Sequence, residues 1–299
     1  TPRDDDSSTT AGPDAPTDVG RFPKESDCPP LGADRVVCFD EVDPDLQPII
    51  LSPSATSGTL PRAQFAFTLR NDAEVAFESN FYHWRLLKRV GGEWFRVAPT
   101  YWPEPLHTLK PDGRHTWSVA VDNGPLAESR DLHAEGTEDL TLVGLGGGEY
   151  AFGVTGSFRG DDRRIALLSQ FSLAGDPLDL TPTTLVTGTE RDGDRVTVDT
   201  KPNPNGASGP AAFVVERVED PKEDVPRAIP EQLVRDSRFR DTLPFFEEGV
   251  RTVRLRRPRG GRGSVGSWGS GDGATFEYRG TVYRTREVES TNATTGTTA

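Results

Sequence analysis

Residues 62–71, RAQFAFTLRN, alternate between polar and apolar side chains over most of their length. Successive side chains of an extended strand point to opposite faces, so Phe65, Phe67 and Leu69 share one face. Such alternation predicts a strand that is buried on one side and exposed on the other. The stretch therefore indicates a sheet with one face against a core.

Strand-like runs recur on the C-terminal side of this stretch. Two of them, YHWRLLKRV and EWFRVAP, flank Gly91-Gly92, a pair that suits the tight turn of a hairpin. The others are HTWSVAVD at 115–122, GEYAFGVTGSF at 148–158 and RRIALLSQFSL at 163–173. Six or seven strands over about 130 residues, with almost no helical periodicity, predict an antiparallel sandwich of two sheets.

The run around the Gly-Gly pair contains tryptophan and histidine, which raises the question of a site. One register places Trp84 and Leu86 inward, whereas the other would bury arginines, which desolvation disfavours. We therefore expect Trp84 in the core, with Trp94 as its partner across the turn. His83 then points the opposite way, toward solvent or a binding partner.

Two local patterns resemble immunoglobulin-like domains. LGGGEYAF places Tyr150 two residues after Gly148 at the start of a late strand, which is similar to the tyrosine corner of such domains. LKPDGRHTWSVAV is similar to the loop-then-strand segment of bacterial and archaeal Ig-like modules. The resemblance implies a mainly β, Ig-like antiparallel β-sandwich, without the intersheet cysteine pair of antibody domains.

The second half of the chain has a different pattern. Hairpins are expected at Asp192-Gly193 and Arg279-Gly280, and one helical region is expected in IPEQLVRDSRFRDTLPFFEEG. Pro230 suits a first helical turn, and Pro244 is expected to break the region into two short helices. We predict a smaller α+β domain with its helices on one sheet face. The predicted segments are a disordered acidic Ser/Thr/Pro-rich spacer at 1–27, the sandwich at 28–180, the α+β domain at 181–288 and a polar tail at 289–299.

The composition is acidic and arginine-rich. Asp and Glu number 47 against 34 Lys and Arg, of which only five are Lys, and the net charge is -13. This style resembles secreted surface proteins of salt-loving archaea, because hydrated carboxylates keep a surface soluble in concentrated salt. An ordinary acidic protein of a GC-rich genome is the alternative. The negative charge argues against general nucleic-acid binding.

The two ends suggest an extracellular, cell-surface location. The spacer resembles the tether of a surface lipoprotein, whose lipid-bearing cysteine would stand just before Thr1. No apolar run is long enough for a membrane span, so we expect membrane contact only through such an anchor. Asn292 begins the single N-x-[ST] sequon and is a candidate glycosylation site.

Cys28 and Cys38 are the only cysteines. Two cysteines are too few for a structural zinc site, and neither lies in a C-x-x-C motif. We expect a disulfide that closes a short loop, although two separate buried thiols remain the alternative. A disulfide fits an oxidising compartment outside the cytoplasm.

Familiar catalytic and cofactor motifs are missing from the sequence. It holds no G-x-S-x-G, H-E-x-x-H, P-loop or EF-hand pattern. Gly261, Gly263 and Gly266 match G-x-G-x-x-G, but the following SWGSGDG cannot begin the helix that a dinucleotide needs. The four histidines, at 83, 107, 115 and 133, lack zinc-site spacing. We therefore predict no cofactor, no metal and no enzymatic activity.

One arginine-rich strand and loop is the most unusual local feature. Arg254 and Arg256 share one face of a predicted strand, and the following glycine-rich loop continues the charge with Arg257, Arg259 and Arg262. These side chains form a candidate patch for carboxylates or phosphates. The alternative is a solvated face balanced by acids of the same domain.

Exposed aromatic candidates for partner binding come from the first domain. They are Tyr82, in FYHWRLLKRV, and Tyr101 and Trp102, in PTYWPEPLH. We predict a non-enzymatic surface protein that binds other envelope or surface proteins, which the arginines would suit if those partners are acidic. A protease-inhibitor-like Ig-fold protein and an extracellular hydrolase with an unfamiliar carboxylate site are the alternatives.

Overall fold

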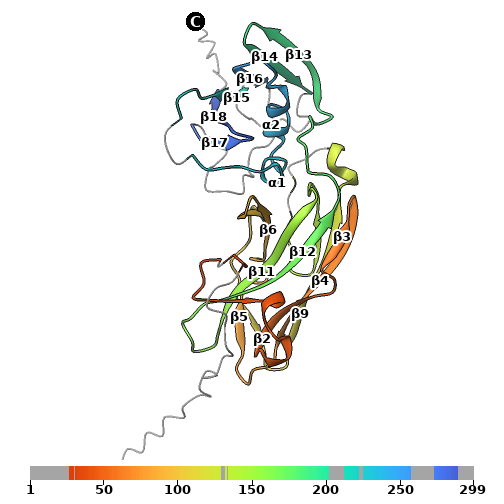
Figure 1. Cartoon of the computed structure of the whole chain (residues 1–299), viewed down its shortest axis with the longest axis vertical. Helices are drawn as coiled ribbons and strands as arrows, with labels where there is room; N and C mark the ends of the chain where they lie inside the picture. Colours follow the sequence, from red (N-terminus) through yellow and green to blue (C-terminus); the bar gives the residue numbers. More distant parts are fainter. Residues whose placement is uncertain are drawn as a thin grey trace, which may run out of the picture.

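The computed structural model is mainly β and consists of two bodies stacked along the long axis of the molecule (Figure 1). It describes residues 27–29, 31–128, 132, 134–201, 212–221, 225–256 and 273–288. We call residues 27–180 the sandwich domain and residues 181–288 the C-terminal domain. None of the helices in these described ranges is long and apolar enough to cross a membrane.

The larger sheet of the sandwich, sheet A, is built on two long antiparallel strands, β11 (Gly148–Phe158) and β12 (Ile165–Ala174). Its other strands are β1 (Arg35–Cys38), β3 (Ser57–Thr59), β5 (Phe77–Ser79), β6 (Arg85–Val90), β7 (Glu93–Ala98) and β8 (His107–Leu109). β1 and β3 both pair with β12 in parallel, at its two ends. The sequence pattern did not predict these parallel pairings.

The facing sheet, sheet B, has the order β10-β9-β4-β2. Its strands are β2 (Ile49–Pro53), β4 (Arg62–Asn71), β9 (Arg114–Asp122) and β10 (Asp139–Leu142). Phe67 of β4 stacks on Phe152 of β11 at 4.4 Å, and both rings are fully buried between the sheets. The predicted Ig-like β-sandwich is therefore confirmed, with the alternating residues of 62–71 facing its core.

Tyr150 makes the corner hydrogen bond that its position suggested. Its hydroxyl donates to the carbonyl of Gly146 at 2.7 Å, and the ring is fully buried. The glycine is required here, because a Cβ at 146 would lie 2.9 Å from a carboxylate oxygen of Glu231 and 2.3 Å from the backbone nitrogen of Leu178. This corner is also where the two domains meet.

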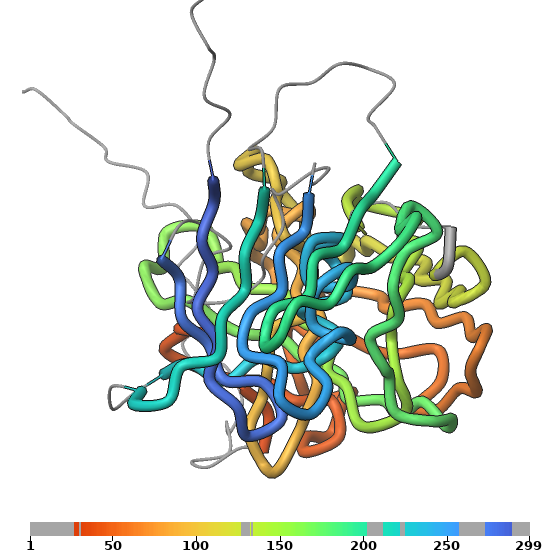
Figure 2. Tube along the Cα trace, turned by 90° about the horizontal axis from the view of Figure 1, so that it is seen from above, coloured from red at the N-terminus to blue at the C-terminus, as the bar shows by residue number. Residues whose placement is uncertain are grey.

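The C-terminal domain contains a third sheet, which is also mixed and has the order β13-β14-β16-β15-β18-β17. Its strands are β13 (Val186–Asp192), β14 (Arg195–Thr200), β15 (Ala212–Arg217), β16 (Thr252–Arg256), β17 (Thr275–Tyr278) and β18 (Thr281–Val288). Figure 2 shows these strands side by side across the end of the molecule. The predicted smaller α+β domain is confirmed, including both hairpins.

The helical region is shorter than predicted. It consists of α1 (Pro230–Leu233), α2 (Ser237–Arg240) and the 3-10 helix η4 (Leu243–Phe245). Pro230 occupies a first turn, as expected. The break lies instead before α2, where the carboxylate of Asp236 caps the backbone N–H of Arg238, and Pro244 lies inside η4. The remaining 3-10 helices are η1 (Phe39–Glu41), η2 (Pro44–Leu46) and η3 (Gly124–Glu128).

The two domains are joined by a buried, highly charged stretch, residues 229–242, which we call the interdomain segment. Glu231 lies against the sandwich and accepts from Lys88 at 2.5 Å and from the N–H of Gly146 at 3.1 Å. Arg235 donates to the carbonyls of Leu132 and Val143. Polar contacts therefore add to the apolar packing that Ile229 and Leu233 of the segment make in the cores of the two domains.

The same segment also binds the C-terminal domain. The guanidinium of Arg238 makes parallel hydrogen bonds to Asp236 and a further bond to Glu287 of β18 at 2.7 Å. Asp241 accepts from both the backbone N–H and the hydroxyl of Thr183. Each of these charges has polar partners, which is the condition for burying a charge without a large penalty.

The disulfide loop covers the outer face of sheet A. Cys28 and Cys38 are joined as predicted, with Cα atoms 6.1 Å apart. Their side chains pack on Leu87, Ala151 and Leu168 in a small satellite core. The loop therefore turns part of an outer sheet face into a second buried layer.

Candidate functional site

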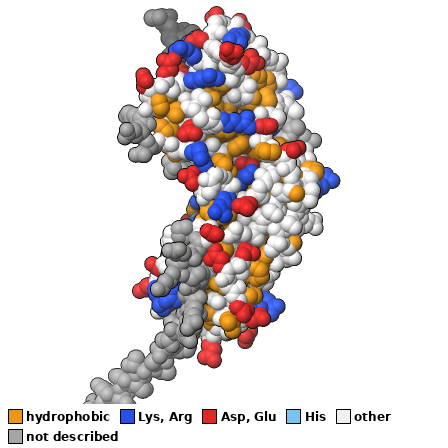
Figure 3. Space-filling model, viewed as in Figure 1, with side chains coloured by type: hydrophobic (Ala, Val, Ile, Leu, Met, Phe, Trp, Pro, Cys, Tyr) orange, Lys and Arg blue, Asp and Glu red, His pale blue; other side chains and the backbone are white. Residues whose placement is uncertain are grey.

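The two described arginines of the predicted arginine strand have different environments: Arg256 is exposed and paired with acids, whereas Arg254 is half-buried and its Nε has no hydrogen-bond partner among the described residues. Arg254 and Arg256 lie on one face of β16, and Arg256 reaches Asp199 at 3.6 Å and Glu190 at 3.9 Å. The register places Thr197 beside Arg254 and Asp199 beside Arg256. Basic and acidic side chains are interspersed over this domain on the face shown in Figure 3. Arg256 therefore favours the balanced alternative, whereas no ion pair to a described acid balances Arg254.

Several predicted residues fall outside the described ranges. These are Arg257, Arg259 and Arg262 of the glycine-rich loop, Asn292 of the tail, His133 and the G-x-G-x-x-G stretch. The loop half of the patch and the glycosylation site stay predictions.

The three aromatic candidates have different environments. Tyr101 is 71% exposed, as predicted, whereas Tyr82 and Trp102 are half-buried. Tyr82 lies 5.8 Å from His107, ring to ring. The prediction that all three are exposed is wrong for Tyr82 and Trp102, because the loops at 80–84 and 99–107 pack on each other through a hydrogen bond from Asn80 to the carbonyl of Pro103.

Trp102 is the centre of a stacked group. The ring of His83 stacks on it at 4.1 Å with an angle of 9° between the planes, and the guanidinium carbon of Arg96 lies 4.2 Å from the ring centroid. The indole N–H donates to the carboxylate of Glu104 at 2.9 Å. The question about His83 is thereby answered: it points outward from the core and packs against Trp102, half-buried.

Trp84 and Trp94 do not form the expected pair. Trp84 is fully buried in the sandwich core, as predicted, and its indole donates to the carbonyl of Gly136. Trp94 pairs across the hairpin with Arg89, on the outer face, so the predicted Trp84–Trp94 contact is wrong. The hairpin register pairs Trp94 with Arg89, which is five residues closer to the turn than Trp84.

Two further arginines complete the group around Trp102. Arg85 donates through Nη2 to Nε2 of His83 at 3.1 Å and through Nη1 to the carbonyl of Leu31 in the disulfide loop. Arg164, just before β12, donates to the hydroxyl of Thr155 at 3.0 Å. We call Arg85, Arg96 and Arg164, with His83, the arginine cluster.

The charges of the arginine cluster act on one another. Burial and then repulsion from Arg85 lower the pKa of Arg96 to about 10, and burial and then Arg164 lower the pKa of Arg85. The pKa of His83 falls to about 4, first through burial of the ring and then through the three arginines. His83 is therefore neutral near pH 7 and accepts the hydrogen bond from Arg85 through Nε2.

No carboxylate among the described residues forms an ion pair with Arg85, Arg96 or Arg164. Their hydrogen bonds go to the carbonyls of Leu31 and Pro99, the hydroxyl of Thr155 and the ring of His83. Nε of Arg96 is buried without a hydrogen-bond partner in the described part of the chain. Guanidinium groups that have no ion pair and keep unused N–H donors are suited to bind an anion bidentately.

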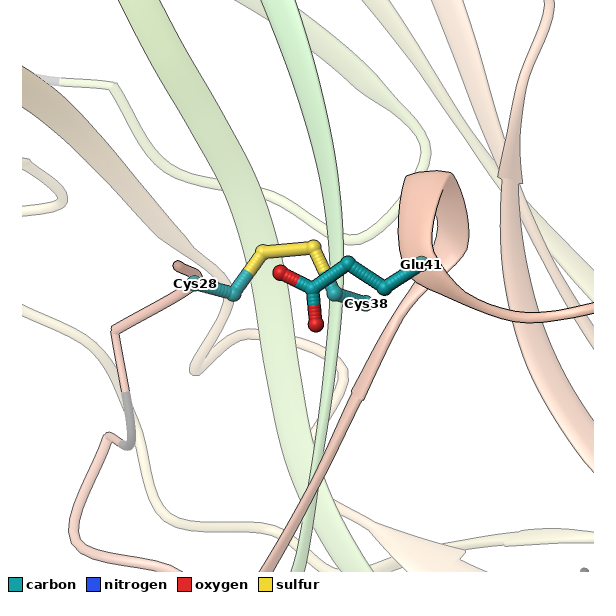
Figure 4. Close-up of side chains that lie close together, drawn as sticks. All are labelled: Cys28, Cys38 and Glu41. Atoms are coloured by element: carbon teal, nitrogen blue, oxygen red, sulfur yellow. A yellow bond between two sulfur atoms is a disulfide. The ribbon is translucent and has the colours of Figure 1, made fainter. Parts of the chain in front are cut away.

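The described residues offer one group with the composition of a metal site, Cys28, Cys38 and Glu41. Figure 4 shows the two sulfur atoms bonded to each other, with the Glu41 carboxylate beside them. Disulfide sulfurs do not act as thiolate ligands, and Glu41 accepts a hydrogen bond from the backbone N–H of Asp27 at 2.8 Å. His107 and His115 stack instead on Phe81, at 4.7 and 4.0 Å.

Sequence reasoning missed the arginine cluster. Arg85 and Arg96 lie on β6 and β7, so the predicted hairpin at Gly91-Gly92 already placed them on neighbouring strands. The predicted hairpin was therefore a sequence signal for the proximity of Arg85 and Arg96. Arg164 joins them only because β12 runs beside β11, which in turn pairs with β6, and no local pattern contains that adjacency.

Comparisons with known proteins were made against families, curated proteins and solved structures. No family model and no curated protein matches the chain. A PapD-like (ASH) domain of human CEP192 is similar over 42% of this chain and 84% of its own, at 16% identity and a TM-score of 0.22.

A beta-glucosidase from Listeria innocua, solved in complex with gluconolactone, is similar over 43% of this chain but only 16% of its own, at 12% identity and a TM-score of 0.21. TM-scores this low carry no argument about function. The assignment of the fold rests on the strand pairings described above.

Proposed function

We propose that this protein is a non-enzymatic, extracytoplasmic surface protein that acts as a protein-binding or assembly module. The disulfide between Cys28 and Cys38 and the acidic, lysine-poor composition support a location outside the cytoplasm, in a salt-rich setting. A glycan on Asn292 belongs to the same proposal.

The observation that carries the proposal is an exposed apolar loop beside unpaired cations. The described residues include three large apolar side chains with high exposure, and two of them, Tyr101 at 71% and Leu106 at 67%, lie on residues 99–106. The same loop carries Trp102 and so adjoins the arginine cluster. Tyrosine and arginine are the residue types that dominate protein interfaces.

The two-domain arrangement supports a binding role as well. The hydrogen bonds of the interdomain segment fix the C-terminal domain on the sandwich, which leaves the 99–106 loop on a rigid support. Rigid presentation lowers the entropy cost of binding.

The test is chemical crosslinking and capture from native cell envelopes in high salt, with the full chain as bait. A double variant, Tyr101→Ser with Leu106→Ser, should lose the captured partner. Leu46→Ser is the matched control, because Leu46 is also 73% exposed but lies on η2, away from the loop in sequence.

Loss of capture in the loop variant alone supports the proposal. Recovery of the wild-type chain only as an unassociated monomer, or equal capture by the loop variant and the wild type, would contradict it.

A further inference from the structure

The arginine cluster brings three guanidinium groups together without an ion pair to a described acid. Other arginines on the surface of the described residues include several that pair with acids, as Arg159 does with Glu78 and Arg286 with Glu216. The protein as a whole has an excess of carboxylates. The guanidinium groups of Arg85, Arg96 and Arg164 form no ion pair with a described carboxylate, although the backbone N–H of Arg164 donates to Asp34 at 2.8 Å. They therefore form a local excess of positive charge on an acidic protein.

The cost of this arrangement is partly electrostatic. Arg85 and Arg96 are half-buried, which removes water from their charges, and each guanidinium lies close enough to another to repel it. An anion placed among the three side chains would remove both penalties at once. Half-buried charges are also screened less by salt than fully exposed ones.

The three side chains are held in place before any ligand arrives. Arg96 stacks on Trp102 and donates to the carbonyl of Pro99, Arg85 is fixed by Leu31 and His83, and Arg164 is fixed by Thr155. A guanidinium that is already ordered loses little entropy on binding an oxyanion. The cluster therefore has the preorganisation of a built site.

The surroundings of the cluster distinguish between classes of anion. Tyr101 and Leu106 present apolar surface on the adjoining loop, which a free inorganic anion would leave uncovered. The ring of Trp102 stacks against His83 and Arg96, so these two contacts already occupy part of its surface. A chain that alternates carboxylate and apolar side chains would use both the cations and the exposed loop.

We propose that the arginine cluster is a carboxylate-binding site for an acidic peptide segment of a partner protein. Aspartate or glutamate side chains pair with Arg85, Arg96 and Arg164, and an apolar neighbour packs on Tyr101 and Leu106. The inference rests on the proposed binding function and names the chemistry of the partner.

The test measures binding of a defined peptide to the purified full chain by titration calorimetry, in about 0.15 M and about 2 M KCl. The Debye length falls from about 8 Å in the first condition to less than about 3 Å in the second, so the comparison shows how strongly salt screens the binding. The probe is an end-blocked peptide of sequence EDFEDE, and its isostere QNFQNQ is the matched control. The acidic peptide should bind at least about tenfold tighter, which corresponds to about 1.4 kcal/mol.

Two variants locate the binding. Arg96→Gln combined with Arg164→Gln should weaken binding of EDFEDE at least about tenfold, whereas Arg256→Gln combined with Arg286→Gln, two arginines that pair with acids of the C-terminal domain, should not change it. In NMR spectra, the peptide should also shift the titration midpoint of His83 upward, because it offsets the three cations.

Equal affinity for the two peptides, or no loss in the Arg96/Arg164 variant, would overturn the inference. Tighter binding of inorganic phosphate or of a sulfated oligosaccharide than of EDFEDE would overturn the assignment to a peptide. If these tests fail while envelope capture still depends on Tyr101 and Leu106, the proposed function stands and only the carboxylate chemistry is wrong.

Discussion

The interdomain segment and the arginine cluster both place charged groups away from water, but only the interdomain segment contains ion pairs between opposite charges. In the interdomain segment, Glu231 has Lys88 as its partner and Asp236 has Arg238. In the arginine cluster, Arg85 and Arg96 repel each other, and Arg85 donates a hydrogen bond to a neutral histidine, His83. Paired buried charges hold a structure together, whereas unpaired half-buried cations leave capacity for a ligand.

The largest expected effect comes from unpairing the interdomain segment. Glu231→Gln leaves Lys88, which is 8% exposed, without its counter-charge, so the free energy of unfolding should fall by about 3–5 kcal/mol. Urea unfolding of the full chain measures it. Glu149→Gln is the control, because Glu149 is 65% exposed and 3.8 Å from Arg89, and it should cost less than about 1 kcal/mol. Similar losses of unfolding free energy in both variants would mean that the buried Lys88–Glu231 pair contributes no more to stability than the exposed Arg89–Glu149 pair.

The disulfide loop is the next test, because it supports the arginine cluster through Leu31. Replacing Cys28 and Cys38 together by serine should lower stability by about 3 kcal/mol, through the greater entropy of the unfolded chain. It should also weaken peptide binding, since Arg85 loses the fixed carbonyl of Leu31. Thermal unfolding and the EDFEDE titration measure the two effects. Unchanged affinity for EDFEDE would show that the disulfide loop does not contribute to peptide binding by the arginine cluster.

A smaller effect is expected at the corner between the domains. Tyr150→Phe removes the hydrogen bond to the buried carbonyl of Gly146 and should cost about 1 kcal/mol. Tyr101→Phe is the control, because the hydroxyl of an exposed tyrosine should contribute less than about 0.5 kcal/mol. Chemical unfolding of both variants provides the comparison, and equal values would argue against a role for the corner.

The effect that is smallest at neutral pH, and that grows as the pH falls, is a pH dependence from His83. Its pKa in the folded protein, about 4, lies below the 6.5 of the unfolded chain, so the unfolded chain binds the proton first. Stability is therefore lost as the pH falls from 6.5 to 4, and His83→Gln should reduce that loss. Melting temperatures at pH 7.5, 6 and 4.5 follow the effect across this window. A parallel pH profile in the variant and wild type would show that His83 does not titrate as described.

Local sequence patterns predicted much of the fold but little of the site. The alternation of Phe65, Phe67 and Leu69 and the turn at Gly91-Gly92 gave strands that the structure confirms. The parallel pairing of β14 with β16 was not predictable, because the paired residues, such as Arg195 and Thr252, are 57 positions apart in the sequence. Arg254 and Arg256 drew attention because they are close in sequence, yet Arg256 is paired with Glu190 and Asp199 of its own domain.

The sequence by itself determined the mainly β class, with an α+β part after the sandwich, and predicted the disulfide, because strand periodicity, turn residues and a short cysteine loop act over few residues. Tertiary structure alone decided which charges have partners. Arg85, Arg96 and Arg164 lie on three separate segments, and a charge is paired or unpaired according to what packs beside it in space. For this reason the arginine cluster becomes visible only in the folded chain.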